Sequence, residues 1–158
     1  KDLNRGFDFG GQKIDPPTAA VIGVGADPNA IDFQREIDRL RQKAAAGAEF
    51  VTTQPVFDPD ALKRFVEAIA DLHLPVIAGI WPLASLRNAF FMKNEVPGVV
   101  VPDAIITRME AANTREEQLA TGIAIAREAV AAVRPYVAGV QVSAPLGNVR
   151  AALAVLAP

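Results

Sequence analysis

Short apolar runs alternate with longer amphipathic segments along most of the chain, and this alternation restricts the fold more than any other feature. The apolar runs predict strands at 19–24, 49–53, 75–80 and 137–142. The longer segments carry apolar residues at three- and four-residue steps, which predicts helices at 31–46, 58–72, 85–94, 103–112, 114–133 and 148–156. Repeated strand–helix order predicts an α/β fold whose parallel strands are joined by right-handed crossovers. The apolar residues 99–101 lie between two prolines and are interpreted as an extended link.

Polar residues at the predicted helix starts support these boundaries. Asp32 and Asp58 stand where an N-cap is expected, and a proline follows Asp58 in the first turn. Asp27 is also interpreted as a cap. Thr114 and Glu117 have the spacing of a capping box, in which each side chain bonds the other residue's backbone N–H.

The number of predicted strands indicates part of a barrel. A closed (β/α)8 barrel has eight strands, and this chain supplies about four. The segment 23–28 (GVGADP) breaks the Gly-x-Gly-x-x-Gly fingerprint, so a dinucleotide-binding doubly wound sheet has little support. Four strands alone would leave two unpaired edges, which proteins normally cover or pair. We therefore predict half of a TIM (β/α)8 barrel with about four parallel βα units, either cut from a longer chain or completed by another.

Composition excludes several classes of function. The formal net charge is −2 and the charges are interleaved along the helices, so neither nucleic acid nor a membrane surface is an expected partner. The chain has no cysteine and one histidine, His73, which argues against thiolate chemistry and a metal site. No apolar run approaches the roughly 20 residues that span a bilayer. A soluble cytoplasmic protein is expected.

The loops that follow the predicted strands are rich in amides, hydroxyls and prolines and poor in acid–base groups. In a parallel barrel these loops form the reactive face, so their composition favours binding of a planar ligand with polar edges. Gln54 is the most informative single residue, because its amide carries donors and an acceptor that match a heterocycle edge. An equally weighted alternative is a strand-end amide that bonds the backbone. Trp81 either stacks on a ligand ring or packs in the core, with packing preferred.

Charged side chains on the first long helix are a second candidate site. Glu36, Arg39 and Lys43 recur at helical spacing on one face. They either hold a phosphate or a ribose, or form a solvated face, which is the preferred interpretation before any resemblance is considered. Arg150 begins the last helix and meets either an anionic ligand tail or water. The residues 90–92 (FFM) are predicted to be core.

Several motifs resemble one enzyme family. Residues 39–43 (RLRQK) and 46–58 (AGAEFVTTQPVFD) resemble the Lys-x-x-x-Ala-Gly-Ala-(acid)-Phe-x-x-Thr-Gln-x-x-Phe-Asp signature of methylenetetrahydrofolate reductases. Residues 78–83 (AGIWPL) resemble the family's Pro-Gly-Ile-x-Pro segment, with Ala78 in place of proline. Residues 4–8 (NRGFD), 17–18 (PT) and 95–98 (EVPG) resemble the branch in which the reductase is fused to a homocysteine S-methyltransferase. The resemblance covers nearly the whole chain.

The resemblance implies a fold and an activity. It implies that residues 1–158 are the C-terminal half of the catalytic barrel. The implied activity is FAD-dependent reduction of 5,10-methylenetetrahydrofolate to 5-methyltetrahydrofolate with NAD(P)H, a step of one-carbon metabolism and methionine biosynthesis. The implied partners are the folate substrate and the N-terminal half of the barrel or a second chain, in a homo-oligomer. The alternative is a non-catalytic half-barrel subunit that binds flavin or folate.

The resemblance also implies roles for individual residues. Glu36, Arg39 and Lys43 would lie along the FAD, with Ala30 at its edge. Folate would contact Gln54 through its pterin, and also Asn88 and Arg150. The family's general acid belongs to the other half of the barrel, so no catalytic residue is assigned here and the isolated chain is expected to be inactive.

Overall fold

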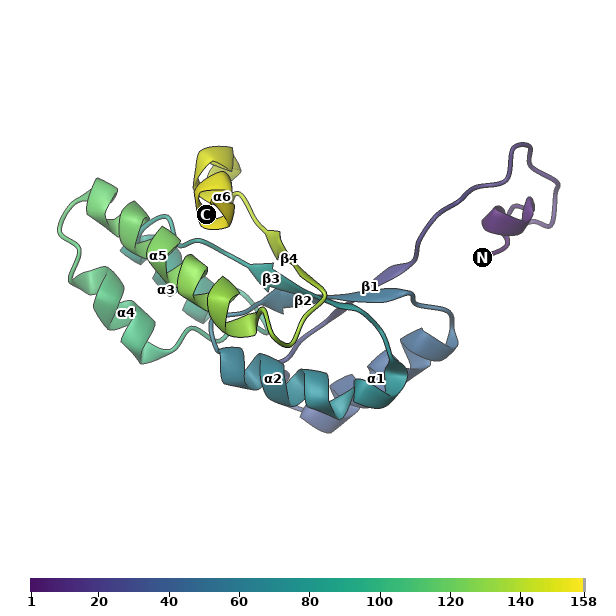
Figure 1. The fold of residues 1–158 in the computed structure, drawn as a ribbon, viewed down its shortest axis with the longest axis horizontal. Coiled ribbons are helices and arrows are strands. Elements are labelled where there is room, and N and C mark those ends of the chain that lie inside the picture. The colour runs from purple at the N-terminus through teal and green to yellow at the C-terminus, as the bar shows by residue number, and fades with distance from the viewer. Residues whose placement is uncertain (158) are drawn as a thin grey trace.

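The computed structural model describes residues 1–157 and contains one sheet of four parallel strands in the order β1-β2-β3-β4 (Figure 1). The strands are β1 Gly23–Ala26, β2 Phe50–Pro55, β3 Val76–Ile80 and β4 Gly139–Val142. The α-helices are α1 Phe33–Ala45, α2 Pro59–Ala68, α3 Leu86–Glu95, α4 Asp103–Glu110, α5 Arg115–Val133 and α6 Val149–Leu156. Three short 3₁₀ helices occupy Leu3–Arg5, Ala70–Leu72 and Pro145–Gly147. The predicted α/β fold with four parallel βα units is confirmed.

Strand boundaries differ from the prediction where pairing, rather than hydrophobicity, sets the end. β1 begins at Gly23 because its ladder partner is Phe50, the first residue of β2. β4 likewise begins at Gly139, opposite Ile77 of β3. The residues 99–101 form no strand, as expected.

The predicted helix caps are confirmed with one exception. Asp32 accepts a hydrogen bond from the Arg35 N–H, and Asp58 caps α2 in the same way. Thr114 and Glu117 form the capping box at the start of α5. Asp27 caps no helix, because α1 begins only after Asp32, so that interpretation was wrong.

One face of the sheet carries the main core. Buried side chains of α1, α2, α5 and α6 pack in a single cluster with alternate strand residues; the members include Leu40, Phe65, Val133, Val155, Val51, Ala78 and Ile80. The strand residues that alternate with them, such as Gly25, Thr52, Ile77 and Gln141, are half-buried or exposed. A doubly wound sheet has helices on both faces, whereas sequential strand order with helices outside is the pattern of a barrel arc. The structure is thus consistent with half of a (β/α)8 barrel.

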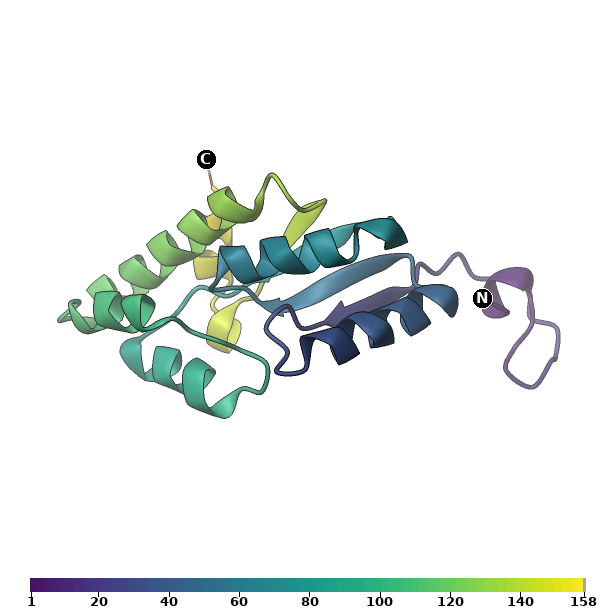
Figure 2. The same ribbon diagram turned by 90° about the horizontal axis from the view of Figure 1, so that it is seen from below.

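A second apolar cluster lies beside the sheet, where α3, α4 and α5 meet (Figure 2). Met92 is buried there, and Trp81 packs against the cluster, as preferred from the sequence. The prediction that Phe90 and Phe91 are core was wrong, since they are 39% and 54% exposed. α3 buries only the face turned toward α4 and α5, and these two residues lie off that face.

The first twenty residues extend away from the sheet (Figures 1 and 2). The Asn4 side chain fixes this segment by donating to the Ala20 carbonyl at 2.8 Å and accepting from the Thr18 hydroxyl. Over residues 1–157, no helix is both long and apolar enough to cross a bilayer, and no group of three or more potential metal ligands is found.

Candidate functional site

A pocket of about 420 Å³ lies at the carboxyl ends of β1 and β2, beside α1. We call it the strand-end pocket; its lining residues are Gly25, Ala26, Asp27, Glu36, Arg39, Thr52, Thr53 and Gln54. Three of the residues predicted for a ligand site, Glu36, Arg39 and Gln54, meet in it. Ligands of open parallel α/β sheets and barrels bind at this end of the strands.

The geometry of α1 brings two charged side chains to the pocket. Ile37 and Leu40 are buried against the sheet and fix the rotation of the helix. Glu36 and Arg39, one turn apart, then face the end of β1. The Glu36 side chain is only 12% exposed, whereas Arg39 is 59% exposed, and their charged groups are 3.9 Å apart. The Arg39 guanidinium is therefore largely available to a ligand.

Thr53 holds the end of β2 in place. Its buried hydroxyl accepts the Gly79 N–H at 3.0 Å and donates to the Gln54 carbonyl at 2.8 Å. The Gln54 side chain is exposed and forms no hydrogen bond with any of the described residues. The structure therefore does not support the interpretation of Gln54 as a strand-end amide that bonds the backbone.

Lys43 lies next to the strand-end pocket without lining it. Its ammonium group donates to the Gly25 carbonyl at 2.7 Å. In this position it joins the last turn of α1 to β1 and places a positive charge at the pocket wall.

Asp27 is a pocket residue whose role the sequence reasoning missed. Its carboxylate accepts the Asn29 N–H at 2.8 Å and so closes a turn at the end of β1. Burial raises the pKa of Asp27; the Asn29 hydrogen bond opposes this rise and the nearby Glu36 charge adds to it. Gly98 packs so closely on the carboxylate that a Cβ there would lie 2.4 Å from Oδ2. The available signal was its place in the loop that follows the predicted strand 19–24.

Ala30 lies in an adjoining pocket of about 330 Å³, which we call the corner pocket. Its other lining residues are Pro28, Asn29, Phe33 and Arg64. Ala30 therefore lies beside the predicted cofactor residues without sharing their pocket.

The two remaining predicted residues lie elsewhere. Asn88 is in the first turn of α3, and its side-chain oxygen accepts the Ala84 N–H at 3.2 Å and the Trp81 indole N–H at 3.3 Å. Arg150 is exposed on α6. Neither lines the strand-end pocket, so their contacts with folate stay predictions.

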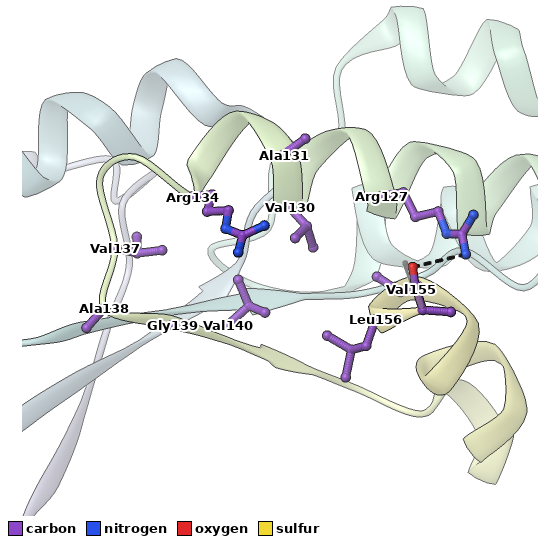
Figure 3. Close-up of a pocket in the computed structure, with 11 residues that line it drawn as sticks. Arg127, Val130, Ala131, Arg134, Val137, Ala138, Gly139, Val140, Val155 and Leu156 are labelled. Carbon is purple, nitrogen blue, oxygen red and sulfur yellow. Dashed lines mark hydrogen bonds between the residues drawn. The ribbon is translucent and has the colours of Figure 1, made fainter.

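A larger cavity, of about 740 Å³, lies away from this end of the sheet (Figure 3). It lies between α5, α6 and the start of β4, and Val130, Val140 and Leu156 line it. Arg127 extends across it to the Ala157 carbonyl at 3.3 Å. The cavity is at the amino end of β4 and contains none of the predicted site residues, so the strand-end pocket is the candidate site despite its smaller volume.

The fold and this pocket define an α/β protein with a candidate site at the carboxyl edge of a parallel sheet, lined by a guanidinium, an amide and two carboxyl groups. Residues 21–142, more than half of the chain, match the family model described as methylenetetrahydrofolate reductase. The chain belongs to this family, which confirms the resemblance read from its motifs.

Named relatives agree with this assignment. Methylenetetrahydrofolate reductase (NADH) 1 of Arabidopsis thaliana is 31% identical over 71 residues, which are 41% of this chain and 12% of that protein. Methylenetetrahydrofolate reductase 2 of Schizosaccharomyces pombe is 29% identical over 114 residues, 62% of this chain and 18% of that protein. Methylenetetrahydrofolate reductase 1 of the same yeast is 29% identical over 87 residues, which are 51% of this chain and 14% of that protein. The chain thus matches less than a fifth of the length of these relatives.

Proposed function

We propose that this chain forms one wall of the active site of a methylenetetrahydrofolate reductase, which reduces 5,10-methylenetetrahydrofolate to 5-methyltetrahydrofolate with FAD and NAD(P)H. One observation carries the proposal: Glu36, Arg39 and Gln54, predicted for cofactor and substrate, come from two different elements and line one pocket. Membership of the reductase family supports it.

The residues present fit a flavin nucleotide. Arg39 offers an exposed cation to an anionic group, and the Glu36 carboxylate offers an acceptor to a sugar hydroxyl. Lys43 holds the Gly25 carbonyl and so keeps the β1 end of the pocket fixed. Bound FAD would supply the hydride-transfer chemistry, and the protein the binding and orientation.

Gln54 is proposed to orient the substrate. Its free amide presents both donors and an acceptor, a pattern complementary to the pterin edge of folate. Thr53 fixes the backbone on either side of this contact through its bonds to β3 and to the Gln54 carbonyl. A positioned amide of this kind orients the substrate without itself transferring a proton.

The proton donor and the remaining wall are proposed to come from other parts of the reductase. The resemblance assigns the general acid to the other half of the barrel. Among the described strands, β1 and β4 each have one neighbour and hence one open edge, which suits further strands from that half or from a second chain. A cytoplasmic homo-oligomer, with small water-soluble folate and nicotinamide partners, belongs to the same proposal.

Flavin retention tests the proposal. The 158-residue chain is mixed with FAD, passed through a desalting column and measured by its visible spectrum. We expect near-stoichiometric flavin for the wild type and substantial loss for Arg39→Gln. Arg35→Gln is the matched control, because Arg35 is also exposed on α1 but does not line the pocket.

The outcomes are distinct. Equal retention by both variants would contradict the assignment of Arg39, and no retention by the wild type would contradict a flavin site in this chain. Bleaching of bound flavin by NADH or NADPH then separates a reductase from a half-barrel subunit that only binds flavin or folate.

A further inference from the structure

Two pockets adjoin at the corner between β1 and α1. Asp27 lines the strand-end pocket and the next residue, Pro28, lines the corner pocket; consecutive Cα atoms are about 3.8 Å apart. On α1, Glu36 lines the first pocket and Phe33 the second, and residues three apart are neighbours on a helix surface. The two pockets therefore lie on either side of residues 27–28 and the start of α1.

The two pockets differ in charge. The strand-end pocket holds two carboxyl groups, Asp27 and Glu36, against the single guanidinium of Arg39. Arg64 of α2 is the only charged residue among those that line the corner pocket. Within residues 1–157 its guanidinium takes part in none of the observed ion pairs or side-chain hydrogen bonds. In the strand-end pocket an anionic group thus meets one guanidinium beside two carboxyl groups, whereas in the corner pocket it meets a cation with no carboxyl group in the lining.

From this arrangement we infer that the corner pocket is an anion subsite in which Arg64 binds a phosphate group of a nucleotide whose remainder extends into the strand-end pocket. The inference rests on the proposed flavin nucleotide function. It adds Arg64 to the proposed binding residues and states in which pocket the phosphate lies. A guanidinium matches phosphate oxygens with two parallel N–H donors. The Asn29 amide and the Phe33 ring provide a polar and an apolar wall for the adjacent part of the nucleotide.

Binding of ADP and adenosine to the 158-residue chain, followed by NMR titration, tests the subsite directly. We expect ADP to bind more tightly than adenosine and to shift the signals of Asn29, Ala30 and Arg64. Arg64→Gln is expected to weaken ADP binding roughly tenfold or more, since a charge-assisted hydrogen bond is lost. Lys63→Gln is the matched control: Lys63 is an exposed neighbour whose ammonium lies 5.6 Å from the centre of the Tyr136 ring, outside the pocket.

Three results would overturn the inference: ADP binding no tighter than adenosine, ADP binding unchanged in Arg64→Gln, or an equal loss in Lys63→Gln. Riboflavin, which has no phosphate, separates this inference from the proposed function, because Arg64→Gln is expected to leave its binding unchanged. If riboflavin fails to bind while ADP binding depends on Arg64, the flavin proposal fails and the subsite stands. If riboflavin binds and ADP binding does not depend on Arg64, the flavin proposal stands and the anion subsite is rejected.

Discussion

The Glu36 carboxylate accepts a hydrogen bond from the backbone N–H of Asp27 at 3.1 Å. This bond ties α1 to the end of β1 at the wall of the strand-end pocket. It also holds two carboxyl groups near each other, so the charge of one affects the protonation of the other. The Glu36 charge accordingly contributes to the raised pKa of Asp27.

Asp27→Asn is expected to change how stability depends on pH. Burial raises the pKa of Asp27 in the folded protein, so the folded state holds this proton more tightly than the unfolded state. The associated stabilisation is complete below the unfolded pKa, about 3.9, and is lost as pH rises through the higher folded pKa. The amide keeps the acceptor for Asn29 and carries no charge. We therefore expect Asp27→Asn to be more stable than wild type at pH 7 and to lose this advantage near pH 3.

Urea denaturation at both pH values measures this effect. Asp38→Asn, which removes an exposed carboxylate from α1, corrects for the change in net charge. A variant that is equally destabilised at pH 3 and pH 7 would show that burial of the charge is not what distinguishes Asp27.

Gln54→Leu is expected to weaken the binding of 5-methyltetrahydrofolate roughly tenfold, because hydrogen bonds to the pterin are worth about 1 kcal/mol each. The fluorescence of Trp81, the only tryptophan, or calorimetry reports the affinity. Gln141→Leu removes another exposed glutamine, on β4 and outside the pocket, and should bind folate as the wild type does. Equal affinities for all three proteins would remove Gln54 from the substrate site.

Gly122→Ala is expected to destabilise the fold by about 1–3 kcal/mol. A Cβ at Gly122 would lie 1.8 Å from the backbone oxygen of Leu83, so α5 would have to move away from the loop after β3. The same movement would stretch the 3.0 Å hydrogen bond from the Leu86 N–H to Gln118 of α5.

Urea denaturation followed by circular dichroism compares this variant with Gly139→Ala. In the control the new Cβ would meet the Ile77 side chain at an ordinary 3.5 Å. Similar midpoints for wild type and Gly122→Ala would show that the helix and loop separate at little cost.

Local chemistry explains why much of the fold is predictable from the sequence. Hydrophobic periodicity indicates the type and order of the strands and helices. The caps Asp32, Asp58 and Thr114 satisfy backbone N–H groups within three residues of themselves, so their role needs no distant contact. Gln54 directly follows the predicted strand 49–53. Hydrophobic patterning along the chain therefore also predicts its position at the end of a parallel strand.

Other features depend on contacts between segments far apart in the chain, and only the tertiary structure decides them. The ladder with Phe50 sets the start of β1, and the packing of α3 against α4 and α5 leaves Phe90 and Phe91 in solvent. Gly98 packs against the Asp27 carboxylate, interpreted from the sequence as a helix cap, and this carboxylate is half-buried. The sequence alone thus determined the elements and several ligand-binding candidates, because these follow from local chemistry. The tertiary structure decided which candidates share a pocket, because that depends on how α1 lies against β1 and β2.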